Sequence, residues 1–379
     1  MNKKIGIIAL VLIVLVGGYF VYQSVQKEKT SPVEELETIK IGAILPLTGP
    51  AGSLGVYYKN GIELKVNEIN DNGGFYGRKI ELFIEDSKTS PKDGVNAANK
   101  LIATKDKPLF VFSHLSSISI AISPILKKYK IPLIAVSASD KLLDYDLAIR
   151  NYITPQRLAA FSFNNFHNKL NIKNFALIYV NDDFGNSVAE NFKLECKNNN
   201  VNIVYDDVFN LTETDYKNLV LKIINSNPEG VYITGYGQPL GILIKQLKDY
   251  KYKGKICTGI EITQPELIDF LGDYANDIYF PNILFNNNSE KEKNVNFNEE
   301  YHKLYHKKSF SASAMAYDGI QIMLDAYQKA GYDTQRFIEI MNMESTFNSL
   351  NGELLIKNRE IKYPFVLNKL ESKKIINVE

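Results

Sequence analysis

Glu261 is a lone acid between two isoleucines in the stretch KGKICTGIEITQPELIDFLG (253–272). A short apolar strand pattern over 255–258 ends just before it, and a helical pattern follows Pro265. Ligands of open α/β sheets bind beyond the carboxyl ends of the strands. A carboxylate at this position is therefore a catalytic base, a charge partner for a ligand, or a solvated loop residue.

Polar and aromatic side chains also follow the other predicted strands. In the first half of the chain, HLSSIS follows PLFVFS and SASD follows IPLIAV. In the second half, NDDFGNS follows FALIYV and YGQP follows EGVYITG. If the two halves face each other, these groups line one cleft, with Glu261 opposite Ser117 and Ser139.

The elements that would position these groups alternate between strand and helix from Ile39 onward. Most predicted strands are short, β-branched and continuously apolar, which is typical of strands covered on both faces. Repeated βα units form parallel sheets with right-handed crossovers. Because the pattern runs through two sets of strands, before and after about residue 155, we expect two doubly wound domains in tandem. The predicted strands are 39–46, 78–86, 108–113, 131–137, 174–181, 202–209, 229–235 and 254–259, and the helical patterns include 56–71, 92–104 and 216–226.

The composition is that of an ordinary globular protein. The chain has 379 residues, 45% of them hydrophobic and 23% charged, which suggests two domains or one large one. A formal net charge of +1, without a long run of like charge, argues against nucleic-acid binding. Two cysteines, Cys196 and Cys257, are too few for a disulfide framework and lack the spacing of a metal site.

The N-terminus predicts export. Two lysines precede an apolar run over residues 5–22, and a run of roughly 18 residues is about long enough to cross a bilayer as a helix. The charges place the N-terminus inside and the rest of the chain outside. Because a cleaved signal peptide usually has a shorter apolar core and a clearer cleavage site, we favour an uncleaved anchor. The polar stretch 26–38 would then be a tether, within a signal/anchor segment that spans 1–38.

Two other patterns have simpler structural interpretations. Gly73, Gly74 and Gly77 precede a strand, whereas a phosphate-binding glycine loop follows a strand and opens a helix. These glycines are therefore expected in a turn between helix and strand. His302 and His306 lie one helical turn apart, but no third metal ligand is evident, and we expect no metal site.

The sequence gives little support for catalysis. Asp182 and Asp183 could form a carboxylate pair, but a loop or helix-cap role fits them better. No GxSxG elbow, HExxH motif or kinase motif is present. Because no nucleophile or metal constellation accompanies Glu261, an enzyme that uses it as a general base is disfavoured. We expect no catalytic residue and no cofactor.

Several segments resemble the branched-chain amino acid-binding proteins of ABC transporters. They are IKIGAILPLTGPAGSLG (39–55), NGIEL (60–64), NEINDNGGFYGRKIELFIEDSKTSPKDGVNAANKLI (67–102), AYDGIQIMLDAYQKAG (316–331) and FNSLNGELLIKNREIKYPFVLNKLESKKI (347–375). The resemblance covers about residues 39–376. It implies the type I periplasmic-binding fold, in which two doubly wound lobes joined by three chain crossings close on a ligand. With crossings near 155, 284 and 350, lobe 1 would comprise 39–155 plus 285–349, and lobe 2 would comprise 156–284 plus 350–379.

The resemblance also implies two sets of ligand-binding residues. Ser117, with Ser116 as its neighbour, matches the serine that holds the ligand carboxylate, although it could merely cap its helix. Ser137 would offer its carbonyl oxygen to the ligand ammonium. Ser139, usually threonine in the family, would bind through its hydroxyl and backbone N–H. Glu261 matches the acid that pairs with the ammonium.

The walls of the implied pocket are aromatic and apolar. Phe184, commonly tyrosine in the family, and Tyr236 match aromatic residues beside the ligand side chain, although packing at a strand end explains them nearly as well. Leu54 stands where some relatives have an aromatic residue. The pocket would therefore be more apolar, which fits leucine, isoleucine or valine without excluding other apolar ligands.

The resemblance implies capture of a ligand. We expect an extracytoplasmic solute-binding subunit of an ABC importer that takes an amino acid between closing lobes and presents it to a permease. The alternatives are the same fold with an amide, urea or aromatic acid as ligand, or an extracytoplasmic ligand sensor.

Overall fold

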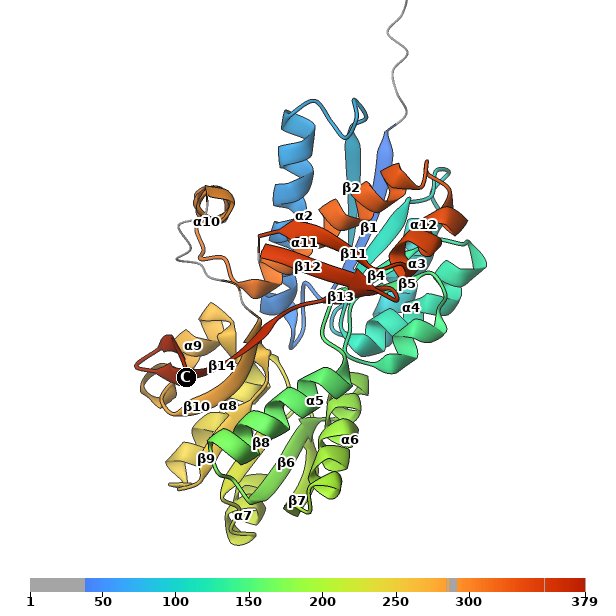
Figure 1. The fold of residues 1–379 in the computed structure, drawn as a ribbon. Coiled ribbons are helices and arrows are strands. Elements are labelled where there is room, and N and C mark those ends of the chain that lie inside the picture. The colour runs from blue at the N-terminus through green and yellow to red at the C-terminus, as the bar shows by residue number, and fades with distance from the viewer. Residues whose placement is uncertain (1–37, 284, 286–291, 351, 379) are drawn as a thin grey trace, which may run out of the picture.

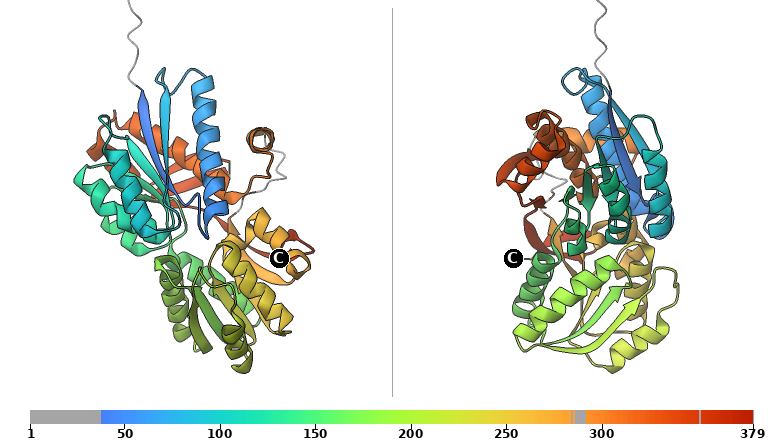
Figure 2. Two further views of the ribbon diagram at one scale, coloured as in Figure 1. Left: turned by 180° about the vertical axis from the view of Figure 1, so that it is seen from behind. Right: turned by 90° about the vertical axis from the view of Figure 1, so that its right-hand side faces the viewer.

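The computed structural model describes residues 38–283, 285, 292–350 and 352–378. These residues form two α/β lobes, each built on a mostly parallel sheet (Figures 1 and 2). The expected pair of α/β lobes is therefore confirmed. The predicted membrane segment at 5–22, and its tether up to residue 37, lie outside the described residues. Within the described part of the chain, no helix is long and apolar enough to span a bilayer.

Lobe 1 contains the eight-stranded sheet, in the order β11-β12-β13-β5-β4-β3-β1-β2. The strands β1 to β5 and β13 are joined in parallel, whereas β11 and β12 form an antiparallel extension at one edge. Their bounds are β1 (Ile39–Leu45), β2 (Ile80–Asp86), β3 (Phe110–His114), β4 (Leu133–Val136), β5 (Ala148–Arg150), β11 (Ser345–Ser349), β12 (Gly352–Lys357) and β13 (Glu360–Lys362).

Lobe 2 contains the seven-stranded sheet, in the order β15-β14-β10-β9-β8-β6-β7. Here β6 to β10 are parallel, and β14 and β15 add an antiparallel edge. The bounds are β6 (Asn174–Val180), β7 (Asn202–Phe209), β8 (Gly230–Thr234), β9 (Lys255–Thr258), β10 (Ile278–Ile283), β14 (Phe365–Glu371) and β15 (Lys374–Asn377).

Helices cover both sheets. Those of lobe 1 are α2 (Gly52–Asp71), α3 (Pro91–Ile102), α4 (Ser116–Lys128), η1 (Asp140–Asp144), α10 (Glu292–Tyr305), α11 (Ser311–Lys329) and α12 (Thr334–Asn342). Those of lobe 2 are α5 (Pro155–Phe163), η2 (Asn164–Lys169), α6 (Asp183–Asn198), α7 (Lys217–Asn225), α8 (Gly237–Asp249), η3 (Ile260–Thr263), α9 (Pro265–Leu271) and η4 (Gly272–Tyr274). In Figure 1 they group around the upper and the lower sheet respectively.

The strand order creates a switch point in each sheet. In lobe 1 the chain moves from β1 outward to β2, then returns across β1 to β3 and continues in the opposite direction. Right-handed crossovers therefore put α2 on one face and α3 and α4 on the other. The same reversal occurs in lobe 2 between β6 and β8. Ligands of such sheets bind at the carboxyl ends of the strands beside the switch point.

Local sequence explains where the central elements begin and end. Every residue of β3 is buried, as a continuously apolar strand between two helical layers requires. Ser90 accepts a hydrogen bond from Asp93 N at 3.3 Å and starts α3, with Pro91 in its first turn. Thr154 caps α5 in the same way, with Pro155 next to it. A side-chain acceptor followed by proline satisfies the free N–H groups of a new helix.

The order of the described strands shows that the chain passes between the lobes three times. The first crossing follows β5 and the second follows β10. The third was expected near residue 350, and that expectation is wrong, because β12 and β13 pair within the lobe 1 sheet. The chain leaves lobe 1 only between β13 and β14, at residues 363–364. The short turn after β12 brings β13 back beside β5, where Glu360 pairs with Arg150.

The first and third crossings lie side by side. The Tyr363 hydroxyl donates a hydrogen bond to Asn151 Oδ1 at 2.7 Å, and both residues are buried. Asn151 Nδ2 in turn donates to the carbonyl oxygen of Met315 in α11 at 3.0 Å. The two connecting segments are thus tied to each other and to lobe 1.

The lobes also touch away from these crossings. Gln264 Nε2 donates to Ser53 Oγ at 2.7 Å, and the Tyr57 hydroxyl donates to Glu266 Oε1 at 3.0 Å. Lys141 Nζ lies 3.0 Å from Asp183 Oδ1, a contact between η1 and the start of α6. The structure is therefore a closed arrangement in which both lobes face one cleft.

Candidate functional site

A cavity lies between the lobes at the carboxyl ends of the central strands. The space between its walls measures about 510 Å³, part of which is open to solvent. Most of the wall is apolar or aromatic, and none of the described lining residues is Lys or Arg. The lining residues are Leu54, Tyr58, His114, Leu115, Ser116, Val136, Ala138, Tyr152, Phe184, Tyr236, Ile260, Glu261, Phe310, Ser311, Ala312 and Met315.

The structure brings only some of the expected site residues to the wall of this cavity. Those in the wall are Ser116, Phe184, Tyr236 and Glu261. The others are sequence neighbours of lining residues without being lining residues themselves: Ser117 next to Ser116, and Ser137 and Ser139 on either side of Ala138.

Glu261 lies on η3, just after β9, and is half-buried as a residue, whereas its Oε2 atom is shielded from solvent. The Tyr152 hydroxyl donates a 2.6 Å hydrogen bond to Glu261 Oε1, while Oε2 has no hydrogen-bond donor among the described residues. Gly259 makes room for Oε2, since a side chain at Gly259 would overlap it. An acceptor that is buried without a donor is costly. The arrangement is therefore suited to a ligand that supplies a donor.

The pKa of Glu261 reflects this environment. Burial raises the pKa to about 7 from an ordinary value of 4.5, and hydrogen bonds from Tyr152 and from the backbone N–H of Glu261 itself oppose the rise. Asp182 adds a smaller upward contribution through its negative charge. A cationic group placed beside Oε2 would favour the ionised form. The site is thus poised to gain most from a positively charged ligand group.

The wall opposite Glu261 contains the start of α4. This helix begins at Ser116, and its N-cap residue Leu115 has a left-handed φ of 77° and forms no side-chain cap. The first-turn N–H groups of α4 are therefore available to an anion, which the helix dipole also favours. Ser116 Oγ accepts a hydrogen bond from Ala138 N at 3.2 Å, which joins the helix start to the loop after β4.

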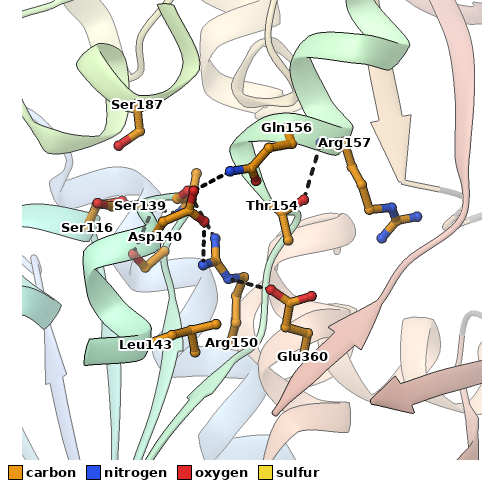
Figure 3. Close-up of polar contacts among 12 residues, drawn as sticks. Ser116, Ser139, Asp140, Leu143, Arg150, Thr154, Gln156, Arg157, Ser187 and Glu360 are labelled. Atoms are coloured by element: carbon orange, nitrogen blue, oxygen red, sulfur yellow. Dashed lines mark hydrogen bonds and ion pairs between the residues drawn. The ribbon is translucent and has the colours of Figure 1, made fainter. Parts of the chain in front are cut away.

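The loop after β4 is held from behind by Arg150, whose side chain is fully buried (Figure 3). Arg150 Nη1 donates to the Ala138 carbonyl oxygen at 3.0 Å, and Nη2 donates to Asp140 Oδ1 at 3.0 Å. Glu360 Oε1 lies 3.4 Å from Arg150 Nε, and Gln156 of lobe 2 donates to Asp140. A planar guanidinium with several partners fixes the backbone around Ser139. Sequence reasoning did not find this network.

Ser137 and Ser139 lie within the loop that Arg150 fixes. Both are buried, and Ser137 Oγ accepts a hydrogen bond from Ser139 N at 3.3 Å. Ser139 Oγ is buried without a hydrogen-bond partner among the described residues. Ser117, by contrast, is half-buried in the first turn of α4.

Aromatic rings form the lobe 2 wall. The ring centroids of Phe184 and Tyr236 are 6.1 Å apart. The Tyr236 hydroxyl donates to Asp182 Oδ2 at 2.6 Å, and Asp182 Oδ1 accepts from Gly185 N at 2.9 Å. Asp182 is therefore the N-cap of α6, which confirms the helix-cap interpretation of this residue.

Several lining residues were missed by sequence reasoning. His114 ends β3, and its ring lies 4.2 Å from that of Tyr58 in α2. Burial lowers the pKa of His114 to about 3, so its ring is neutral. Tyr152 lies on the first crossing, and Phe310 precedes α11. The position of His114 directly after an apolar strand was a signal for it, whereas no local pattern marks Tyr152 or Phe310.

No alternative chemistry is evident in the described residues. Cys196 and Cys257 are both free and buried, and burial raises the pKa of the Cys196 thiol to about 12. No group of three His, Cys, Asp or Glu side chains in the described part of the chain is arranged to hold a metal ion.

Comparisons with known proteins identify clear relatives. The family model described as "Periplasmic binding protein" matches residues 38–361. The Leu/Ile/Val-binding protein BraC3 of Rhizobium johnstonii is 27% identical over 308 residues, which cover 77% of this chain and 80% of the relative. Leu/Ile/Val-binding protein homolog 1 of Brucella abortus is 25% identical over 328 residues, which cover 83% of this chain and 85% of the relative.

Solved structures share the fold. The leucine-binding protein LivK of Thermotoga maritima superposes with a TM-score of 0.81 at 22% identity and covers 90% of this chain and 98% of its own. LivJ of Streptococcus pneumoniae, solved with isoleucine, has a TM-score of 0.81 at 22% identity, with 89% and 97% coverage. A solute-binding protein of Rhodopseudomonas palustris, solved with 3,4-dihydroxybenzoic acid, has a TM-score of 0.79 at 21% identity, with 90% and 96% coverage.

The enclosure of the Glu261 carboxylate predicts a stability cost for the closed form without ligand. Its folded pKa of about 7 lies above the ordinary value of 4.5, so the folded state binds this proton more tightly than the unfolded state does. The cost appears as pH rises above 4.5 and is complete above pH 7. We expect Glu261→Gln to raise the free energy of unfolding by up to about 3 kcal/mol at pH 8 and by little at pH 4.5.

Urea unfolding of the ligand-free protein at both pH values measures this difference. Glu353→Gln, a change of an exposed glutamate on β12, is the control and should change stability equally at both pH values. Equal effects of Glu261→Gln at pH 4.5 and pH 8 would contradict the assignment of a buried, costly carboxylate.

Proposed function

Because this chain belongs to the periplasmic binding protein family, we propose that it is the extracytoplasmic solute-binding subunit of an ABC importer and captures a branched-chain amino acid. The observation that carries this proposal is that a carboxylate of lobe 2 and an uncapped helix start of lobe 1 line the same apolar cavity. Glu261 has one buried oxygen without a donor, and the uncapped start of α4 lies across from it. A zwitterion with an apolar side chain satisfies both ends and fills the wall between them.

Each part of such a ligand has a suitable partner. The carboxylate would bind the first-turn N–H groups of α4, with Ser116 and Ser117 beside it. The ammonium would bind Glu261 and the carbonyl oxygen of Ser137. Ser139 would bind through its hydroxyl and backbone N–H, and its Oγ has no other described partner.

The side chain of the ligand would lie against apolar and aromatic groups. Leu54, Phe184 and Tyr236 line the cavity together with Ile260 and Met315. None of these side chains is charged, so polar ligand side chains would lose their hydration without compensation. Leucine, isoleucine and valine fit this wall, in agreement with the names of the relatives.

Closure couples the two ends of the site. The α4 start belongs to lobe 1 and Glu261 to lobe 2, so only the closed form engages both ends of a zwitterion. The ligand would then shift an open–closed equilibrium by its higher affinity for the closed form. We propose lobe 1 as 39–150 plus 285–362 and lobe 2 as 155–284 plus 365–379, with a permease that recognises the closed pair.

An aromatic acid is the second candidate ligand, because structural relatives have been solved with 3,4-dihydroxybenzoic acid and 4-hydroxybenzoate. Such ligands have a carboxylate but no ammonium. They would leave Glu261 buried without a counter-ion, which is strongly unfavourable. The orphan oxygen of Glu261 therefore favours an amino acid. An extracytoplasmic ligand sensor would use the same binding site, so the site does not separate a sensor from a transport subunit. Genes for a permease and an ATPase beside the gene for this protein would favour transport.

The membrane segment at 5–22 would hold the binding lobes outside the cell on the 26–38 tether. Native full-length protein should then sediment with membranes and retain Met1. Deletion of residues 1–30 should leave leucine binding unchanged, because lobe 1 begins at β1. A soluble native form that starts near Lys27 would show a cleaved signal instead.

The charge pair is tested with leucine and 4-methylpentanoate, which lacks only the amino group. Removal of one partner from a buried charge pair costs roughly 2–5 kcal/mol, so Glu261→Gln should weaken leucine binding by at least ~25-fold. The carboxylic acid should bind wild type poorly and be nearly indifferent to the substitution. Calorimetric titration of both ligands with both proteins gives the coupling energy. A coupling energy near zero would mean that Glu261 does not interact with the ligand ammonium.

Closure itself is tested at Gly237. This residue has φ +68°, and an added Cβ would overlap the carbonyl oxygen of Pro50 on the opposite lobe. Gly237→Ala should therefore obstruct the closed form, weaken leucine binding about tenfold or more, and prevent full compaction in solution scattering at saturating leucine.

Gly331→Ala is the matched control for this change. Gly331 has a similar φ of +64°, but an added Cβ would have open space around it. Both substitutions carry the backbone cost of a left-handed alanine, about 1–2 kcal/mol. Only Gly237→Ala should affect binding and compaction, and equal effects of both changes would refute the contact as a determinant of closure.

A further inference from the structure

Tyr152 is the buried aromatic residue that connects the hinge to the cavity. It lies between β5 and α5, on the first crossing, and is 5% exposed. Its ring lines the cavity, and its hydroxyl reaches Glu261 Oε1 at 2.6 Å. The hydrogen bond therefore joins the connecting segment to the functional group of lobe 2.

This bond determines which carboxylate oxygen is free. A tyrosine hydroxyl has one proton to donate, and Tyr152 donates it to Oε1. The other oxygen, Oε2, remains buried and has no donor among the described residues. We propose that Tyr152 is a positioning residue that fixes the Glu261 carboxylate so that Oε2 receives the ligand ammonium. This inference rests on the proposed function for the identity of the ligand.

The surroundings of Glu261 make this donor important. The groups that face it are Tyr58 from α2, Asp182 from the N-cap of α6, Tyr232 from β8 and Tyr236 from the N-cap of α8, with His114 of β3 in the same cavity. Tyr236 gives its proton to Asp182, and Tyr232 lies 3.3 Å from Ser162 Oγ. Among the side chains that the structure describes, Tyr152 is thus the one that donates a hydrogen bond to Glu261.

Electrostatics supports the same role. Burial raises the pKa of Glu261, and the hydrogen bond from Tyr152 lowers it. Burial also raises the pKa of Tyr152 well above its usual value, so its hydroxyl remains a donor at neutral pH. Loss of the hydroxyl should therefore shift the titration of Glu261 to higher pH. A purely packing role for the Tyr152 ring would not change that titration.

The first experiment needs no ligand. The carboxyl group of Glu261 is followed by ¹³C NMR in full-length protein labelled at glutamate, with Glu261→Gln to assign its signal. Tyr152→Phe keeps the ring and should raise the pKa of Glu261 by about one unit, the scale of a hydrogen bond to a charged group. Tyr145→Phe removes a buried hydroxyl that donates to the Ile131 carbonyl oxygen at 2.6 Å, and should leave the titration unchanged.

The second experiment measures leucine affinity at two pH values. If the pKa rises from about 7 to about 8, the ionised fraction at pH 7 falls from about a half to about a tenth. Tyr152→Phe should then bind leucine more weakly than wild type at both pH values, because the carboxylate is no longer fixed, and the loss should be about fivefold larger at pH 7 than at pH 9, where both proteins are ionised. In the Glu261→Gln background, Tyr152→Phe should cause little further loss, because its effect passes through the carboxylate.

Glu261→Asp serves as a second variant. It keeps the carboxylate but shortens the side chain, and so disrupts the hydrogen bond with Tyr152 from the acceptor side. It should weaken leucine binding, and Tyr152→Phe should add little to it. An unchanged Glu261 titration in Tyr152→Phe, or an affinity loss equal at pH 7 and pH 9, would overturn the inference. If wild type does not bind leucine, the proposed function fails, and the carboxyl titration still decides the role of Tyr152.

Discussion

The rest of the site depends on the enclosure of one carboxylate between two lobes. One oxygen of the Glu261 carboxylate accepts a hydrogen bond from Tyr152, and the other oxygen is shielded from solvent without a donor among the described residues. A buried charge of this kind destabilises the closed form until an opposite charge arrives. The same property makes closure conditional on a ligand that carries a cation. The cost of closure without a cation and the selectivity for a cationic ligand therefore have the same origin, the carboxylate oxygen that lacks a donor among the described residues.

The surrounding elements explain how Glu261 Oε2 is held without a donor among the described residues. Gly259 leaves space for Oε2, η3 follows directly from β9, and Tyr152 approaches from the connecting segment. On the opposite wall, Arg150 fixes the loop that borders the start of α4. Each wall is thus held by contacts within the protein, which reduces the ordering that a ligand must impose on it.

Sequence patterns predicted the fold class and part of the site. Apolar runs followed by polar loops identified the ends of β3, β6, β8 and β9, because parallel strands present their carboxyl ends at one edge. The same reasoning pointed to the loops that contain Ser116, Phe184, Tyr236 and Glu261, all of which line the cavity. The loops needed only local periodicity and the geometry of βα units, whereas the choice of Ser116, Phe184 and Tyr236 within them came from the family resemblance.

Other features depend on contacts between distant segments. The expected crossing near residue 350 placed 352–362 in lobe 2, whereas pairing of β12 with β13 and of β13 with β5 assigns this segment to lobe 1. Tyr152 has no local signal, because its role arises from a residue 109 positions later. The N-cap residue of α4, Leu115, adopts a left-handed backbone, and no sequence pattern reveals this conformation.

The tie between the first and third crossings restricts how the lobes can move. Asn151 and Tyr363 are bonded to each other, and β5 and β13 are paired immediately before the chain leaves lobe 1. Two adjacent pivots define a line, so the lobes can bend about that line but resist sliding or twisting past each other. Interlobe geometry is then described by one angle. A partner that touches both lobes can read the occupied state from that angle alone, without any contact with the ligand.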